Sequence, residues 1–200
     1  MTTVTSIDAL RRLYDMPQER AVKKELTRLD RHHKSFIALS PFLVISSTGA
    51  NGQVDASPRG DRAGFVQVLN DATITIPDWP GNNRLDTLTN IIERPQVGLL
   101  FLIPGVTEQM RVNGRAVIDT EESLRRPFET RGKLPKSVIR VSVEQAYLHC
   151  SKAIMRSSLW DESRKVDRSV LPTLTEMLRD QTGIASSEAD LQARYQKTLY

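Results

Sequence analysis

The N-terminal part of the chain carries apolar residues at helical spacing among many charged ones. Between Ile7 and Ser35 these apolar positions are Leu10, Leu13, Tyr14, Ala21, Leu26 and Leu29. The pattern predicts two amphipathic helices. They are separated near Pro17, because proline is tolerated in the first turn of a helix but not in its interior. We therefore expect a helical arm over residues 1–35.

From Phe36 onward the pattern changes to the short runs that are typical of strands. The runs at 42–46 and 53–59 flank Asn51-Gly52, a pair that favours a tight hairpin. Further strands are expected at residues 65–69, 72–76, 97–103, 108–118 and 138–149. Gly114 lies inside one of these runs and is expected to mark a bulge or kink.

One helical pattern, at 84–93, interrupts the strands, with Asn82 or Asn83 as its expected N-cap. Residues 121–137 form a polar connector with room for a short helix, and 171–178 and 189–199 are helical by pattern. Six or seven strands joined mostly by short turns predict a mainly β fold, an antiparallel barrel with N- and C-terminal helices. We expect a barrel domain over 36–160 and a helical tail over 161–200 that packs on it.

Composition narrows the class of protein. The chain has 200 residues and a net charge of +4, with 39% hydrophobic and 26% charged residues, which suits one well-cored domain and excludes a disordered chain. No apolar run approaches the roughly 20 residues that a membrane helix needs, and the N-terminus lacks the layout of a signal peptide. We therefore expect a cytoplasmic protein with no membrane partner.

Cysteine and histidine offer little chemistry in this sequence. The single cysteine, Cys150, excludes an internal disulfide. His32 and His33 are adjacent on a predicted helix and point about 100° apart, so no metal site is expected. Cys150 follows His149 on a predicted strand, where neighbours face opposite sides, so a buried cysteine is expected rather than a nucleophile.

Two polar segments lie where the hydrophobic pattern does not require polarity. Ser57–Asp61 ends a predicted strand, and its glycine lets backbone amides approach an anion; the alternative is a turn with a surface ion pair. Asn82-Asn83-Arg84 precedes a helix, where an arginine is unfavourable unless an anion lies beside it; the alternative is a tolerated, exposed arginine. The block 41–120 has six arginines and no lysine, which suits phosphate or carboxylate recognition or arises by chance.

Two more segments have the same character. In 109–114, Gln109, Arg111 and Asn113 share one strand face while Met110 and Val112 point to the core; a solvated outer face has the same pattern. In 149–160, Lys152 and Arg156 are four residues apart and could clamp an anion if the segment is helical, with Trp160 one turn further on. A basic helical face with Trp160 as a packing anchor is the alternative.

Four motifs follow one another along the chain: Ser57-Pro58-Arg59-Gly60-Asp61, Asn82-Asn83-Arg84-Leu85, Arg94-Pro95 and Gln109-Met110-Arg111-Val112-Asn113-Gly114. In this order they resemble the pyridoxamine 5′-phosphate oxidase-like, FMN-binding split-barrel family over about residues 36–160. The resemblance is strongest to a bacterial branch with Ser-Pro-Arg-Gly-Asp and His-Cys-x-Lys-Ala motifs, here 57–61 and 149–153. It implies a homodimer of split barrels with two FMN molecules at the subunit interface.

The resemblance also implies a set of cofactor-binding residues. Arg59 and its neighbours would run along the flavin and ribityl chain, Asn83 and Arg84 would hold the phosphate, and Gln109 would contact the cofactor. Segment 149–160 would contribute as well, through Lys152, Arg156, Ser157 and Trp160. In one arrangement these residues come from the other subunit. The full implied set is Ser57, Pro58, Arg59, Gly60, Asp61, Ile76, Asn82, Asn83, Arg84, Gln109, Arg111, Lys152, Arg156, Ser157 and Trp160.

The sequence departs from true pyridoxamine phosphate oxidases at three places. Those enzymes have two consecutive basic residues where Asn83-Arg84 stands, an Arg-x-x-x-x-Lys strand at 57–62, and an Arg-x-His segment that has no match after Trp160. The vitamin B6 reaction is therefore not carried over. We expect an FMN-dependent oxidoreductase that acts on another small molecule, with NADPH or NADH as a candidate electron donor. No catalytic residue is assigned; Asp61, Asp78 and Tyr147 are candidates without further support.

Two other classes of function remain as alternatives. The absence of an obvious acid or base favours a flavin- or deazaflavin-binding carrier or redox sensor without turnover. The pI near 9.4 favours a nucleic-acid binder, but the barrel offers few aromatic residues for base stacking beyond Phe65 and Trp79. We therefore expect no nucleic-acid partner.

Overall fold

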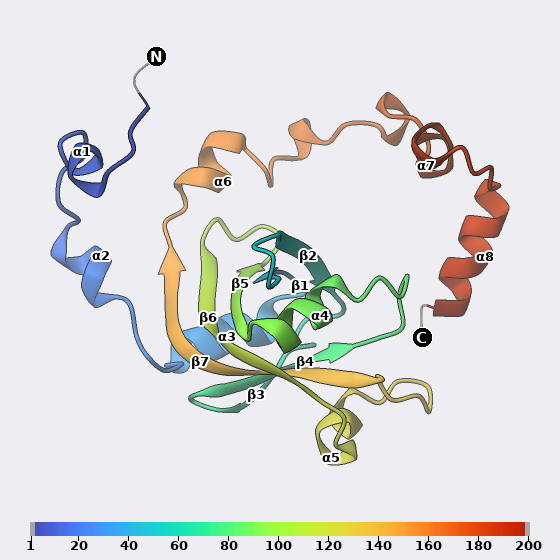
Figure 1. Cartoon of the computed structure of the whole chain (residues 1–200), viewed down its shortest axis with the longest axis horizontal. Coiled ribbons are helices and arrows are strands. Elements are labelled where there is room, and N and C mark those ends of the chain that lie inside the picture. The colour runs from blue at the N-terminus through green and yellow to red at the C-terminus, as the bar shows by residue number, and fades with distance from the viewer. Residues whose placement is uncertain (1–2, 199–200) are drawn as a thin grey trace.

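A computed structural model describes residues 3–198 and places seven strands of this part of the chain in one antiparallel sheet (Figure 1). The strands are β1 (Phe42–Thr48), β2 (Val54–Gly60), β3 (Gln67–Asn70), β4 (Thr73–Asp78), β5 (Gln96–Leu102), β6 (Gln109–Asp119) and β7 (Ser137–His149). Their order across the sheet is β2-β1-β5-β6-β7-β4-β3. The sheet curls into a barrel whose edge strands β2 and β3 are not paired with each other, so the barrel is split. The predicted fold class is confirmed.

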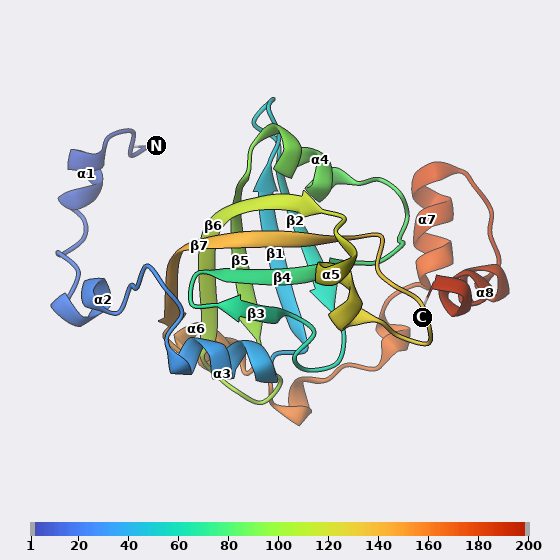
Figure 2. The ribbon, with the colours of Figure 1, turned by 90° about the horizontal axis from the view of Figure 1, so that it is seen from below.

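Helices lie before, within and after the run of strands (Figure 2). They are α1 (Ile7–Arg11), α2 (Glu19–Lys23), α3 (Arg31–Leu39), α4 (Asp86–Glu93), α5 (Glu122–Arg125), α6 (Lys152–Ser157), α7 (Leu174–Thr182) and α8 (Glu188–Thr198), with short 3₁₀ turns at Arg126–Phe128, Glu162–Arg164 and Arg168–Val170. As predicted, α4 follows the fourth strand and the connector holds a short helix. The last residue of the predicted tail helix, Leu199, lies outside the described residues.

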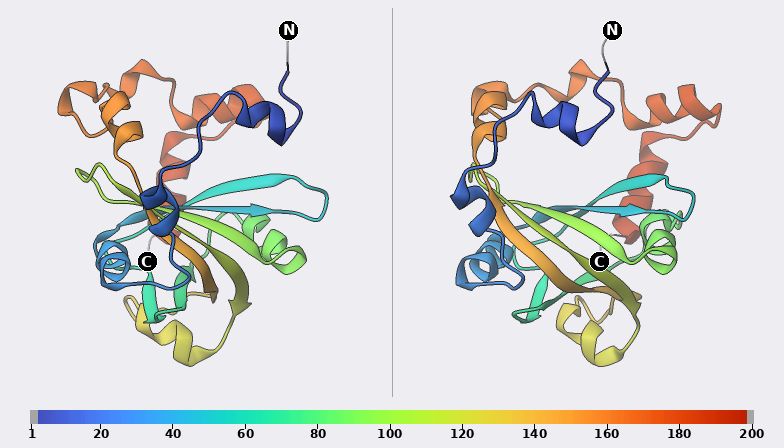
Figure 3. Two further views of the ribbon diagram at one scale, coloured as in Figure 1. Left: turned by 90° about the vertical axis from the view of Figure 1, so that its left-hand side faces the viewer. Right: turned by 60° about the vertical axis from the view of Figure 1, so that its left-hand side comes forward.

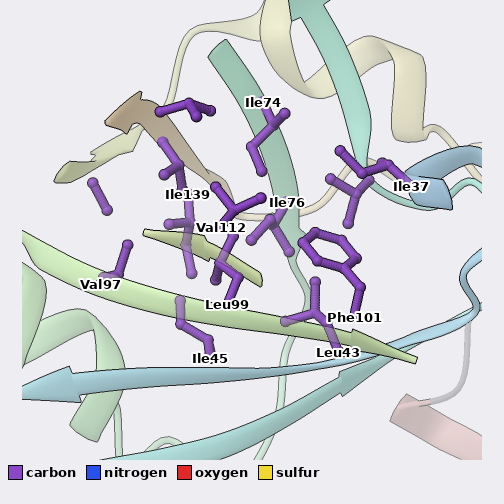
Figure 4. Close-up of a cluster of buried hydrophobic side chains, with 14 of the residues drawn as sticks. Ile37, Leu43, Ile45, Ile74, Ile76, Val97, Leu99, Phe101, Val112 and Ile139 are labelled. Carbon is purple, nitrogen blue, oxygen red and sulfur yellow. The ribbon is translucent and has the colours of Figure 1, made fainter. Parts of the chain in front are cut away.

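The core fills the inside of the curled sheet. Every second side chain of β1 and β5 points inward, and Leu43, Ile45, Leu99 and Phe101 are almost completely buried. Figure 4 shows them meeting side chains from β4, β6 and β7, with Ile37 of α3 closing one side. Burial of each such side chain stabilises the fold by about 1.5–3 kcal/mol, so the core holds the sheet in its curled form.

A bulge in β6 lets the two longest strands stay paired. The β6–β7 register shifts between Asn113 and Gly114, as the sequence predicts. A Cβ atom on Gly114 would overlap the backbone oxygen of Ser142 on β7. Only glycine permits this close approach of the two backbones.

The arm differs from the expectation, because it holds three helices and the last one extends beyond residue 35. Helix α3 begins after Asp30, whose carboxylate accepts hydrogen bonds from the backbone N–H groups of His32 and His33, both at 2.9 Å. His33 and Ile37 lie one turn apart and are buried against the barrel. The helix ends before Ser40, because the following Pro41 disfavours helical geometry.

The expected burial of Cys150 is wrong, since this residue is exposed. Strand β7 ends at His149, so Cys150 lies in the turn before α6 instead of continuing the alternation of the strand.

The arm and the tail extend along the outside of the barrel (Figure 3). Helices α1 and α2 contain no buried residue. In the described tail, Thr175 is the one buried residue, and its hydroxyl donates a hydrogen bond of 2.9 Å to Glu188 of α8. In the single chain the tail thus packs on itself, and apolar side chains such as Leu171 and Ile184 stay exposed. Within residues 3–198, no helix combines the length and apolar character that a membrane crossing requires.

We expect Gly114→Ala to lower the free energy of unfolding by about 1–3 kcal/mol, the usual cost of forcing extra atoms into a packed site. Gly81→Ala is the matched control, because a Cβ there meets nothing within 4 Å; its effect should stay within about 0.5 kcal/mol. Urea unfolding of both variants checks this. Equal stability of the two variants would show that the bulge does not depend on glycine.

Candidate functional site

A cavity of about 510 Å³ lies at the split of the barrel, between the end of β2, the end of β4 and the loop that leads to α4. It is lined by Ser57, Pro58, Arg59, Gly60, Asp61, Phe65, Pro77, Asp78, Trp79, Pro80, Gly81, Asn82, Asn83, Arg84, Leu85, Asp86, Thr87 and Leu88. The fold therefore brings together two of the four polar segments, Ser57–Asp61 and Asn82-Asn83-Arg84. We call this cavity the pocket.

The polar side of the pocket follows from the alternation of β2. Ser57 pairs with Ile45 of β1 and Arg59 pairs with Leu43, so both point to the inner side of the sheet. Because β2 has no strand on its other side, these side chains meet the open pocket instead of the apolar core. Arg59 donates a hydrogen bond of 2.9 Å to the carbonyl of Pro58.

Asp55 connects β2 to α4 beneath the pocket. Its carboxylate accepts hydrogen bonds from the Ser57 hydroxyl at 2.9 and 3.0 Å and from the Thr87 hydroxyl at 2.6 Å. Sequence reasoning missed Asp55 and Thr87. The spacing of Asp55, Ser57 and Arg59 at every second residue could have revealed Asp55, whereas nothing local marks Thr87 as its partner.

The loop before α4 has an unusual backbone. Asn83 and Leu85 both have φ of 61°, the left-handed region that non-glycine residues rarely adopt. Such strain tends to collect at functional sites. Helix α4 begins at Asp86, and its N-cap Leu85 provides no side-chain hydrogen bond to the first turn.

The prediction that Asn82 or Asn83 caps this helix is therefore wrong. The Asn82 side chain instead accepts a hydrogen bond of 3.0 Å from the backbone N–H of Arg84 and stabilises the loop itself. The first N–H groups of α4 remain without a side-chain cap, which is an arrangement that favours an anion.

Arg84 already has an anionic neighbour. Its Nε lies 2.8 Å from the Asp86 carboxylate, and its side chain is 72% exposed. This carboxylate explains how an arginine is tolerated at the start of a helix. An incoming phosphate has to share Arg84 with Asp86 or displace it.

Asp78 is a half-buried acidic residue of the pocket. Burial raises the pKa of its carboxyl group, although the positive charges of Arg59 and Lys136 act in the opposite direction. The protonated form of Asp78 is thus favoured relative to an exposed aspartate.

The other two polar segments lie outside the pocket. Met110 and Val112 are fully buried, which confirms that Gln109 and Arg111 point to the outer face of the sheet. Gln109 is buried and donates a hydrogen bond to the carbonyl of Thr107. Arg111 donates a hydrogen bond of 2.9 Å to the Tyr147 hydroxyl.

The predicted helix at Lys152 and Arg156 exists as α6, and both side chains are exposed. The Ser157 hydroxyl donates to the carbonyl of Ala153 at 3.0 Å, within the helix. Trp160 Nε1 donates a hydrogen bond of 2.8 Å to the carbonyl of Val106 and is half-buried. This supports the packing role of Trp160.

One candidate residue lies in the core. Ile76 is fully buried in β4 and does not line the pocket, whereas the next two residues, Pro77 and Asp78, do. The residues described contain no group of histidine, cysteine, aspartate and glutamate that could hold a metal ion.

The two groups of candidate residues lie on opposite faces of one sheet. Across the strands, Arg59 is level with Leu43, Phe101 and Met110, so three strand spacings of about 4.8 Å separate β2 from β6. Arg59 faces inward, while Gln109 and Arg111 face outward. A single chain therefore does not bring both groups to one ligand.

Comparison with known proteins identifies the fold independently. The family model described as pyridoxamine 5′-phosphate oxidase matches residues 29–150. HupZ from Group A Streptococcus is 20% identical with a TM-score of 0.51, over 60% of this chain and 93% of that one. A putative pyridoxamine 5′-phosphate oxidase from Lactobacillus delbrueckii is 16% identical with a TM-score of 0.48, over 62% and 98% of the two chains.

HutZ from Vibrio cholerae, described as a heme storage protein, is 13% identical with a TM-score of 0.43, over 61% of this chain and 94% of its own. No curated protein matches the chain. At 20% identity the HupZ structure shows the fold alone.

We expect Asp78→Asn to raise the free energy of unfolding at pH 7. Because the pKa of Asp78 is raised in the folded state, its contribution to stability is complete below the ordinary pKa of 3.8 and is lost as the pH rises through the folded value. The amide avoids this loss, so the advantage of the variant should shrink as the pH falls toward 3.8. Denaturant unfolding from pH 3 to 7 checks this, with the exposed Asp8→Asn as control. A difference that stays constant with pH would contradict the assignment.

Proposed function

The chain belongs to the pyridoxamine 5′-phosphate oxidase family, and we propose that it is an FMN-dependent oxidoreductase whose cofactor lies in the pocket. The observation that carries this proposal is the meeting of Ser57–Asp61 with Asn83 and Arg84 around one cavity at an uncapped helix start. These are the segments in which the motifs resemble those of FMN-binding relatives.

The pocket suits FMN in size and in the order of its lining residues. Its volume of about 510 Å³ lies within the range of about 300–1,000 Å³ that is common for small-molecule sites. Phe65 and Trp79 offer apolar surface for the ring system, and Ser57 and Arg59 offer polar groups for the ribityl hydroxyls. The N–H groups at the start of α4, together with Arg84, suit the phosphate.

The bound cofactor supplies the chemistry of hydride or electron transfer, which no side chain provides. The residues of the chain bind and orient it. Burial raises the pKa of the Asp78 carboxyl group beside the pocket and so favours its protonated form, and we assign it the role of proton donor.

A second copy of the chain completes the site in this proposal. Gln109 and Arg111 face outward, and the neighbouring Val44, Leu100 and Leu102 form a half-buried apolar surface on the same face of the sheet. Packing of two such faces would cover this surface and bring outer-face residues of one copy to the pocket of the other. The proposed assembly is a homodimer with two flavins.

Arg84→Ala should weaken FMN binding by roughly 1.5–3 kcal/mol, the scale of a hydrogen bond to a charged group. Asp86→Asn should strengthen it, because the variant removes a negative charge beside the phosphate and releases Arg84. Flavin absorbance and mass identification of the cofactor released by heat give the occupancy of each variant. Arg62→Ala serves as control, since Arg62 is exposed and does not line the pocket. The phosphate assignment fails if Arg84→Ala retains as much FMN as Arg62→Ala.

The alternative is a flavin or deazaflavin carrier that uses the same pocket without turnover. The two functions are separated by following NADPH and NADH oxidation by the flavin-loaded protein. We expect steady oxidation that Asp78→Asn reduces without loss of bound flavin. Flavin that stays bound and is reduced only once per chain would favour the carrier.

A further inference from the structure

Four residues outside the pocket form a cluster on the outer face of β6 and β7. They are Lys24, Arg111, Tyr147 and His149, which we call the basic cluster. Lys24 Nζ lies 5.4 Å from the centre of the Tyr147 ring, and the guanidinium carbon of Arg111 lies 5.6 Å from it. The rings of Tyr147 and His149 are 5.2 Å apart.

The arm holds this cluster in a defined geometry. Leu26 and Ala146 exchange two backbone hydrogen bonds, of 3.0 and 2.8 Å, along the part of β7 that β4 does not reach. Lys24 Nζ donates a further hydrogen bond of 2.6 Å to the carbonyl of Leu148. The ammonium group is therefore positioned by the fold and does not move freely in solvent.

The two charged side chains of the basic cluster, Lys24 and Arg111, are both positive. In the part of the chain that the structure describes, neither Lys24 nor Arg111 forms an ion pair with a carboxylate. Glu108, on the loop before β6, accepts hydrogen bonds from Ser151 at 3.1 Å and from Thr107 at 3.4 Å. The positive charges of Lys24 and Arg111 lie beside the same Tyr147 ring and repel each other, and no ion-paired carboxylate among the described residues offsets this repulsion.

His149 adds an incomplete hydrogen-bonding group. Its Nε2 is buried and has no hydrogen-bond partner. Burial and the charges of Arg111 and Lys24 lower the pKa of His149, which favours the neutral imidazole. Cation–π attraction accounts for the two ring contacts, but it explains neither the missing counter-ion nor the unpartnered nitrogen.

We propose that the basic cluster is a binding site for the oxyanion group of a small-molecule ligand, a phosphate or a carboxylate. Arg111 provides a planar, forked donor for two oxygens, Lys24 provides a compact positive charge, and His149 Nε2 donates to the same group when it carries the ring proton. None of the four residues lines the pocket of its own chain, so oxyanion binding by the cluster can be measured in flavin-free protein, apart from the proposed flavin site.

Inorganic phosphate and acetate are the probes, and histidine NMR is the direct measurement. The chain has three histidines, and His149→Gln identifies the His149 signals. An oxyanion beside the imidazole stabilises its protonated form, so either probe should raise the pKa of His149 in flavin-free protein. Failure of both probes to shift the titration of His149 overturns the proposal.

Substitutions of the two cations should change affinity unequally. We expect Arg111→Gln to weaken binding of the probe roughly tenfold, the loss of about 1.4 kcal/mol, and Lys24→Gln to weaken it by a smaller factor. Lys23→Gln is the matched control, because the neighbouring Lys23 is paired with Glu19 at 2.5 Å and lies outside the cluster; it should change nothing. Arg111→Lys keeps the charge and should bind more tightly than Arg111→Gln if both fold. Equal affinity of Arg111→Gln, Lys24→Gln and the control overturns the assignment.

The oxyanion could come from a separate compound or from the phosphate of FMN held by a second copy. Comparison of FMN with riboflavin, which lacks the phosphate, separates these sources. If the cluster binds the FMN phosphate, Arg111→Gln weakens binding of FMN but not of riboflavin. If it binds a separate compound, phosphate or acetate still binds to flavin-loaded protein and both flavins bind Arg111→Gln as they bind the wild type. Either result supports an oxyanion site, whereas a variant that weakens FMN and riboflavin equally, with no effect on phosphate or acetate, contradicts it.

Discussion

The open side of the barrel is the constraint on which the rest of the structure depends. Strand β2 pairs with β1 only, so its second side has no backbone partner among the described strands. The inward face of an inner strand has to be apolar, but the inward face of β2 meets a gap. Asp55, Ser57 and Arg59 can therefore point inward. Because they do not enter the apolar core, they avoid the free-energy cost of burying polar groups without hydrogen-bond partners. The pocket exists because the sheet curls without closing.

Strand β7 also has a free edge, but there the N-terminal arm covers it. The second half of β7 extends beyond β4, and the arm fills this free edge through Leu26. An edge strand that is left open invites pairing with other chains. Here a short piece of arm covers it and brings Lys24 to Tyr147. The free edge of β2 thus borders a pocket, and the free edge at the end of β7 supports a charged cluster.

The pocket and the basic cluster differ in their balance of positive and negative side chains. The pocket combines Arg59 and Arg84 with Asp61, Asp78 and Asp86, and its clearest ion pair is internal, between Arg84 and Asp86. The phosphate that we propose for the pocket would therefore compete with a carboxylate for Arg84. In the described part of the chain, the two cations of the basic cluster are not paired with a carboxylate, so an anion there meets no such competitor. The two sites are expected to differ in how steeply binding falls with added salt.

The sequence by itself determined the strand pattern, the helix after the fourth strand, the bulge at Gly114 and the faces of Gln109, Arg111, Met110 and Val112. These features depend on spacing along one segment, where the periodicity of the backbone decides which side a residue occupies. The tertiary structure decided the rest: the contact of Asp55 with Thr87, the pairing of Arg84 with Asp86 in place of an asparagine cap, and the exposure of Cys150 in a turn. It also decided that the polar segments lie on opposite faces of one sheet. Such outcomes depend on which strands become neighbours and where a strand ends, and the local pattern of residues carries no information about either.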